Sequence, residues 1–91
     1  MPTITDDYSV DATGWTEIAT GTDVAPVNIV FEVDRKDSIL VRFADVAPVA
    51  GDETKFHNIT RQKLTAWYQI KSKVYARGRA GAVTFTATIT T

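Results

Sequence analysis

Within the last stretch of the chain, residues 81–91, hydrophobic and polar residues alternate without interruption from residue 83 to residue 90. Val83, Phe85, Ala87 and Ile89 occupy every second position, and threonine occupies the positions between them. A period of two is typical of a β-strand with one buried face, because successive side chains point to opposite sides of a sheet. The pattern therefore predicts a terminal strand with one apolar and one hydroxylated face.

The hydroxylated face of this predicted strand carries no charge. Edge strands are usually protected by lysine, proline or a bulge, and neither lysine nor proline occurs between residues 83 and 91. We therefore expect that either a neighbouring strand of the same sheet or a partner subunit covers the strand. Thr86 and Thr88 are candidate contacts for such a partner.

Shorter alternating runs predict further strands. They lie at residues 15–19, 27–33, 39–44, 64–70 and 74–78, with at most a short strand within 53–59. The polar loop at residues 34–37 separates two of these runs and predicts a β-hairpin. The glycine-flanked turn at residues 79–81 predicts a second hairpin, which leads into the terminal strand.

Residues 60–70 are compatible with two kinds of element. Several residues that favour helices predict a helix, whereas the alternation that begins at Leu64 predicts a strand, which is the interpretation we prefer. In a strand, Trp67 and Tyr68 point to opposite faces. One of the two side chains is then expected to lie outside the core.

The first 13 residues alternate only in part, because Asp6 and Asp7 interrupt the pattern. This segment is expected to form either a first strand or an extended arm that becomes ordered on a neighbouring subunit. Residues 14–91 are expected to form one all-β domain. About seven short strands without a periodic helix predict an antiparallel β-sandwich or a small barrel.

The composition limits what can stabilise this domain. The chain has 91 residues, of which 44% are hydrophobic, and it has no cysteine. It therefore suits one small domain without disulfide bonds or cysteine-based metal sites. Such domains often gain buried surface by association, so a homo-oligomer is expected. No long apolar run and no signal-like N-terminal segment occurs, which predicts a soluble protein that has no secretory signal and no membrane contact.

Charge is distributed unevenly along the chain. Up to Glu53 there are eleven acidic and three basic residues, a net charge of −8, and from Thr54 onward there are seven basic and no acidic residues, a net charge of +7. An acidic surface that docks on the basic surface of another copy would explain this division. Early and late strands that pair and mix their charges would also explain it, and this is the interpretation we prefer. Nucleic acid is not expected as a partner, because the pI is about 5.7 and no motif of a nucleic-acid reader occurs.

No residue pattern points to catalysis, a metal or a cofactor. The acidic pairs are Asp6 with Asp7, Asp34 with Asp37, and Asp52 with Glu53. All three lie in polar, turn-like sequence, whereas an acid catalyst needs a carboxyl group in a buried or crowded cleft. The single histidine, His57, lacks a neighbouring cysteine or carboxylate cluster and is interpreted as a surface or hydrogen-bonding residue. The chain is therefore expected to be no enzyme, with no catalytic residue, no metal site and no cofactor.

Aromatic residues on the predicted strands permit one kind of ligand site. Trp15, Trp67, Tyr68 and Tyr75 could stack on sugar rings, as they do in lectin-like modules. Aromatic residues in strands more often belong to a core or an interface. Both interpretations remain open at this point.

Three stretches together resemble small virion proteins of tailed bacteriophages. They are residues 14–21 (GWTEIATG), 44–48 (ADVAP) and 74–77 (VYAR), the last followed by a glycine turn and the alternating strand. The resemblance covers most of residues 14–91. It implies a compact β-sandwich that serves as a head-decoration, head-fibre or tail-tip component. It also implies a homotrimer or ring, located in the virion and docked on a neighbouring capsid or tail protein.

Our leading hypothesis is therefore a non-enzymatic structural component of a phage virion that acts through self-assembly. The alternative is a carbohydrate-binding or host-adhesion module on the same particle. The candidate interface or ligand contacts are Trp15, Trp67, Tyr75, Arg77, Arg79, Thr86 and Thr88.

Overall fold

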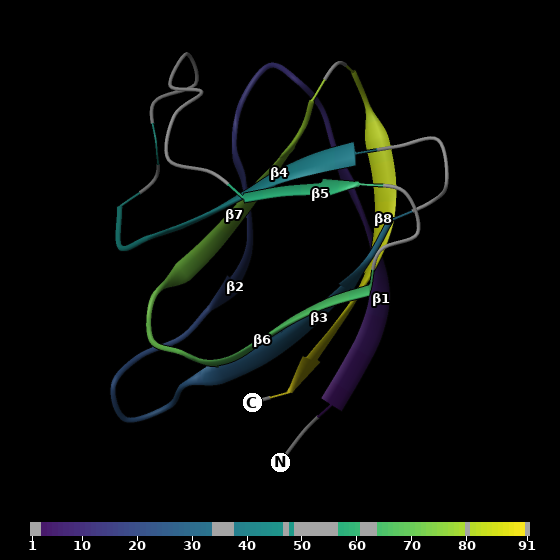
Figure 1. The fold of residues 1–91 in the computed structure, drawn as a ribbon. Helices are drawn as coiled ribbons and strands as arrows, with labels where there is room; N and C mark the ends of the chain where they lie inside the picture. Colours follow the sequence, from purple (N-terminus) through teal and green to yellow (C-terminus); the bar gives the residue numbers. More distant parts are fainter. Residues whose placement is uncertain are drawn as a thin grey trace.

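Eight strands account for the regular structure of the described chain (Figure 1). The computed structural model describes residues 3–33, 38–46, 48, 57–60, 64–79 and 81–90. The strands are β1 (Thr3–Val10), β2 (Thr16–Thr20), β3 (Val27–Glu32), β4 (Ser38–Ala44), β5 (His57–Thr60), β6 (Leu64–Ile70), β7 (Lys73–Gly78) and β8 (Val83–Thr90). In these ranges there is no helix long and apolar enough to cross a membrane. The predicted all-β class is confirmed, with eight strands instead of about seven.

The strands form two antiparallel sheets of four. Sheet A has the order β1-β8-β3-β6, and sheet B has the order β2-β7-β4-β5. β4 and β5 follow each other in the chain and both belong to sheet B. All other pairs of consecutive strands are divided between the two sheets. In Figure 1, β4, β5 and β7 accordingly lie above β3 and β6. Eight strands wound in this way form a jelly roll, a β-sandwich built from two Greek keys.

The hydrophobic core lies between the two sheets. Phe31 of β3 and Phe85 of β8 are the largest of its fully buried side chains, at most 2% exposed, and their rings lie 5.7 Å apart. Complete burial of a side chain of this size contributes about 1.5–3 kcal/mol to folding. Val83 and Ala87 are buried beside Phe85 on the same face of β8. The apolar face predicted for the terminal strand is thus confirmed.

Both predicted hairpins are wrong. β3 pairs with β6 and β8 in sheet A, whereas β4 pairs with β5 and β7 in sheet B. Likewise β7 and β8 lie in different sheets. Alternation shows that a strand has one buried face, but it does not show which strand lies beside it. A short polar loop can connect two sheets as well as two paired strands.

The first strand is part of the sandwich. β1 pairs with β8 in continuous antiparallel register from Thr3 opposite Thr90 to Val10 opposite Val83. Of the two alternatives for the first 13 residues, residues 3–10 therefore form a strand and not an extended arm. β8 in turn lies between β1 and β3, so neighbouring strands of its own sheet cover both of its edges.

β6 is a strand, as preferred for this segment, and it contains a bulge. One residue of β3, Asn28, lies opposite both Tyr68 and Gln69 of β6, where the register shifts. Gln69 has a positive φ of 57°, and its backbone N–H donates a hydrogen bond to the Asn28 side chain at 2.8 Å. The bulge resets the alternation, so that Trp67 and Ile70 both pack against the core. Tyr68 is 70% exposed, which confirms that one of the two neighbouring rings lies outside.

A close backbone contact fixes one of the connections between the sheets. The Gly21 N–H, just after β2, donates to the Ser72 carbonyl oxygen at 2.9 Å, just before β7. A Cβ atom on Gly21 would lie 2.0 Å from the carbonyl oxygen of Ile70, so a larger residue cannot fit without movement of the backbone. This glycine therefore lets the β2–β3 connection pack against the β6–β7 connection.

Candidate functional site

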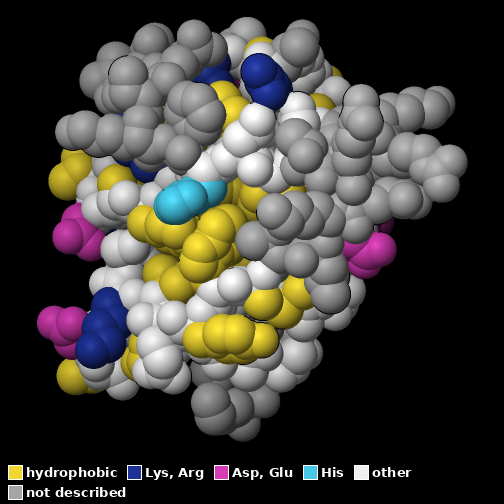
Figure 2. Space-filling view, viewed as in Figure 1, with side chains coloured by type: hydrophobic (Ala, Val, Ile, Leu, Met, Phe, Trp, Pro, Cys, Tyr) yellow, Lys and Arg dark blue, Asp and Glu magenta, His cyan; other side chains and the backbone are white. Residues whose placement is uncertain are grey.

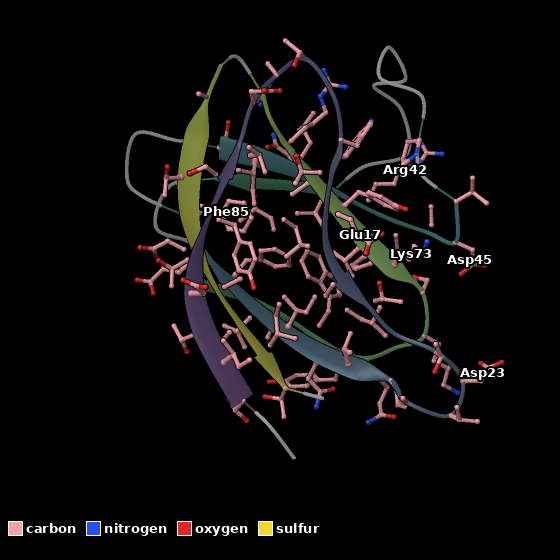
Figure 3. The ribbon with its side chains drawn as sticks, turned by 180° about the vertical axis from the view of Figure 1, so that it is seen from behind. Glu17, Asp23, Arg42, Asp45, Lys73 and Phe85 are labelled. Atoms are coloured by element: carbon pink, nitrogen blue, oxygen red, sulfur yellow. The ribbon has the colours of Figure 1, made fainter. Side chains whose placement is uncertain are left out.

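Among the described residues, each sheet of the sandwich has two outer strands, and each of these has one edge that pairs with no other strand. These strands are β1 and β6 in sheet A, and β2 and β5 in sheet B. β5 and β6 lie side by side, because the rings of His57 and Trp67 are 5.4 Å apart. We call the side of the sandwich where these two strands lie the β5/β6 side, and it faces the viewer in Figure 1. The opposite side, with β1 and β2, is the β1/β2 side and faces the viewer in Figure 3.

Three aromatic rings meet on the β5/β6 side, where the two sheets come together. Phe43 of β4, His57 of β5 and Trp67 of β6 have centroid separations of 5.2 to 5.7 Å. Phe43 and Trp67 are half-buried, and His57 is exposed. Figure 2 shows the single histidine lying against a hydrophobic patch that is open on this side. We call these three residues the aromatic seam, and they give the β5/β6 side an apolar surface.

β6 forms the edge of sheet A beside this seam. Its sequence, LTAWYQI, contains no charged residue and no proline. Charged residues and prolines are the usual means by which edge strands avoid pairing with another chain. The bulge at Gln69 affects only the end of the strand, and Tyr68 is exposed on its surface. Over the residues before the bulge, no described strand pairs with the outer edge of β6, and neither a charge nor a proline protects it.

β1 forms the other edge of sheet A and differs from β6 in charge. Asp6 and Asp7 lie at the middle of this strand, and both are exposed. Asp7 accepts a hydrogen bond from the Thr86 hydroxyl at 2.7 Å. β8, the partner of β1, has no charged residue. The acidic charge at this edge is therefore not balanced by the neighbouring strand.

Four side-chain hydrogen bonds follow one another along the outer face of β1 and β8. They join Thr3 to Thr90 (3.3 Å), Thr5 to Thr88 (2.8 Å), Asp7 to Thr86 (2.7 Å) and Ser9 to Thr84 (3.0 Å). We call this row the hydroxyl ladder. Two of the predicted contact residues, Thr86 and Thr88, thus bond to β1 of their own chain.

Arg77 connects β7 to the loop between β1 and β2. Its side chain is 3% exposed, donates from Nη2 to the carbonyl oxygen of Ala12, and lies over the Trp15 ring at 5.4 Å. The backbone N–H of Gly78 also bonds to the Asp11 carbonyl oxygen at 2.9 Å. Arg77 is therefore a residue that supports this loop. Its predicted role as an interface contact does not fit its burial.

Asp11 organises the same loop. Its Oδ1 accepts hydrogen bonds from the Thr13 hydroxyl at 2.6 Å and the Thr13 N–H at 3.0 Å. These two bonds lower the pKa of the Asp11 carboxyl group, and the positive charge of Arg77 lowers it further. The carboxylate form is thus the one that fits the folded loop.

The structure separates the other predicted contact residues. Tyr75 is 3% exposed, so it cannot be a surface contact, whereas Arg79 is exposed and Trp15 is half-buried beneath Arg77. Trp67 belongs to the aromatic seam. The sequence interpretation did not identify the seam, because its three residues come from different strands and only the fold brings them together.

Acidic residues from the first half of the sequence and basic residues from the second half lie side by side between β2 and β7, but not between β1 and β8. Glu17 of β2 and Lys73 of β7 form an ion pair at 3.8 Å (Figure 3), so early and late strands do pair as one of the two alternatives expected. At β1 no such mixing occurs, since its neighbour β8 is uncharged. Within the described part of the chain, no group of three or more histidine, aspartate or glutamate residues is placed to hold a metal ion.

Comparisons with known proteins identify a similar fold. No protein-family model and no curated protein sequence matches the chain. A solved chain from Bacillus endospore appendages, described as a novel family of disulfide-linked pili, is similar with a TM-score of 0.50 and 16% identity. The match covers 96% of this chain and 85% of that chain. This likeness concerns the β-sandwich fold.

Proposed function

We propose that this chain is a non-enzymatic structural subunit that assembles with its own copies. In the form that the sequence resemblance implies, it is a component of a tailed-phage virion that forms a homotrimer and docks on a neighbouring capsid or tail protein. The observation that carries the proposal is the uncharged edge of β6, which lies beside the half-exposed aromatic seam. An edge of this kind is a template for pairing with another chain.

The fold gives additional support to self-assembly. The similar chain from endospore appendages comes from pili, which are assemblies of many subunits. Those pili are disulfide-linked, whereas the present chain has no cysteine. An assembly of this chain therefore depends on strand pairing, packing and charge.

Two measurements test this function. Sedimentation velocity over a wide range of protein concentration is expected to show a monomer that converts to larger species, with a trimer as the expected closed form. Mass spectrometry of purified phage particles is expected to detect the chain as a component present in many copies. A protein that stays monomeric at every concentration and is missing from the particles would contradict the proposal.

One observation favours the carbohydrate-binding alternative. Tyr68 is 70% exposed and follows Trp67 of the aromatic seam directly in sequence. Exposed aromatic rings provide flat, apolar faces that a sugar ring can cover. Isothermal titration with bacterial surface glycans tests this alternative, and heat that disappears in Tyr68→Ala and Trp67→Ala would support it. The absence of heat with every glycan would exclude it.

A further inference from the structure

We infer that the β5/β6 side of one copy docks on the β1/β2 side of a second copy, with the edge of β6 paired to the edge of β1. Sheet A then continues from one copy into the next. This inference rests on the proposed function, because it names the surface through which the subunits associate. The arguments for it come from strand direction, charge and apolar exposure.

Strand direction permits this contact without any change in the fold. Both sheets have four strands, and every neighbouring pair is antiparallel, so β1 and β6 run in opposite directions. When a second copy with the same orientation is placed beside the first, its β1 is therefore antiparallel to β6. The same holds for β5 and β2 in sheet B. One docking movement can thus extend both sheets in the pairing that they already use.

Charge favours the two different sides as partners. From residue 3 to residue 20, which spans β1 and β2, the sequence has four acidic residues and no basic residue. On the β5/β6 side, the described residues 57–60 and 64–71 contain no acidic residue, and Lys71, which directly follows β6, is basic and exposed. Complementary charge steers the approach of two surfaces and suppresses incorrect pairs. The acidic side of one copy therefore suits a side of another copy that has an exposed lysine and no acidic residue.

The same charges disfavour pairing of β1 with its own copy. The middle of Thr3–Val10 lies between Asp6 and Asp7. In a symmetric antiparallel pair with full overlap, Asp6 of each copy would lie opposite Asp7 of the other. Like charges placed directly opposite each other destabilise a sheet. A contact between different sides, which leads to a ring or a filament, is thus favoured over a closed β1–β1 dimer.

Apolar exposure gives a further reason for a partner on the β5/β6 side. Phe43 and Trp67 are half-buried, and Tyr68 is 70% exposed. Phe43 contacts Trp67, with ring centroids 5.2 Å apart, and Trp67 and Tyr68 lie in the middle of β6, the outer strand of sheet A. A docked copy would remove their apolar surface from water, which stabilises association by about 25 cal/mol for each Å² buried.

Charge reversal on the two edges tests this arrangement. Asp7→Lys places a positive charge on β1, and Tyr68→Asp places a negative charge on β6. Each is expected to weaken association roughly tenfold, which corresponds to about 1.4 kcal/mol, because Tyr68→Asp places a negative charge opposite the acidic edge of β1 and Asp7→Lys removes the attraction between that edge and Lys71. The double variant, with both substitutions, is expected to recover association because the two edges then carry opposite charges. Asp23→Lys, in an exposed turn outside the strands, is the control with the same change of charge.

Sedimentation velocity and circular dichroism on each variant give the outcomes. The expected result is folded protein in all cases, loss of larger species in the two single variants, and recovery in the double variant. If the unaltered protein assembles but neither single variant weakens it, the interface is wrong while self-assembly stands. If only Tyr68→Asp weakens it, β6 pairs with β6 and the inference fails. If the unaltered protein never assembles, the proposed function fails as well.

Discussion

Gln69 has a strained backbone conformation that lets two side chains of β6 pack against the core. Its positive φ of 57° lies in the left-handed region, which costs a residue other than glycine roughly 1–2 kcal/mol. The strain allows Trp67 and Ile70, which are three positions apart, to face the same core. The hydrogen bond from Gln69 to Asn28 holds the bulge in place.

Substitution at Gln69 is expected to reveal this strain. Gln69→Gly relieves it and should raise the free energy of unfolding by about 0.5 kcal/mol, after the greater flexibility of glycine in the unfolded chain is taken into account. Gln69→Val should lower the free energy of unfolding by about 1–2 kcal/mol, since β-branched residues fit a positive φ worst. Chemical denaturation provides the measurement. Glu32→Gly, at an exposed position of β3, should instead be destabilising, and a loss of stability in Gln69→Gly would contradict the argument.

Asp11 makes a different contribution, which depends on pH. Its pKa is lowered in the folded state by the two Thr13 hydrogen bonds and then by Arg77. Because the pKa is lower in the folded state, the Asp11 carboxylate stabilises the fold at pH values above its ordinary pKa of about 3.9. This stabilisation is lost as the pH falls through the pKa of the folded state. Asp11→Asn should therefore be less stable than the unaltered protein at neutral pH. This difference should shrink below about pH 4.

Thermal unfolding followed across this pH range would measure the difference. Asp23→Asn is the matched control, because Asp23 is an exposed turn residue that undergoes the same chemical change. A stability difference for Asp11→Asn that stays constant down to pH 2 would show that its carboxylate charge plays no part.

At the scale of the elements, the hydroxyl ladder is the feature most open to measurement. Thr5 and Thr88 lie directly opposite each other in register, with their hydroxyl groups 2.8 Å apart. A double-mutant cycle with Thr5→Val and Thr88→Val should give a coupling energy of about 0.2–1 kcal/mol. Thr5 with Thr84 is the control pair, since Thr84 lies opposite Ser9. Equal coupling in both pairs would mean that the ladder bonds add nothing specific.

The strands themselves could be predicted from the sequence, but their neighbours could not. Alternation identified β3, β6 and β8, because each buries one face against the core. It placed β3 beside β4 and β7 beside β8, where the structure has them in opposite sheets. Local pattern reflects burial, and pairing depends on contacts between residues that are distant in sequence. The lengths of the loops between these strands fit a hairpin within one sheet and a connection between two sheets equally well.

The candidate site was predictable to a similar extent. Trp67 was identified as a contact residue, whereas Asp6 and Asp7 were considered as interruptions of the first strand and as an acidic pair, but not as contacts. These two residues make one edge of sheet A acidic because β1 is an outer strand of that sheet, which only the topology shows. Tyr75 and Arg77 were expected at a surface because of their residue types, yet the fold buries both.

At the scale of the whole molecule, the charge division predicts how assembly responds to salt. If acidic and basic sides of different copies meet, added salt screens their attraction, since the screening length falls from about 10 Å at 0.1 M to about 3 Å at 1 M. The average mass at a fixed protein concentration should therefore fall as salt is raised over that range. Light scattering is the measurement. A mass that rises with salt would mean that apolar contacts alone drive association.

The pairing of the first strand with the last has a consequence for how the chain reaches this structure. Thr3 lies opposite Thr90, and β8 is also the strand that joins β1 to β3. During synthesis, sheet A therefore cannot close until β8 has left the ribosome, and β1 must wait until β2 to β7 have been made. Structures dominated by such distant pairings fold slowly, in milliseconds to seconds. We therefore expect β1 to take its place at the edge of sheet A late in folding, so that contacts with another copy through this edge form only after β8 has paired.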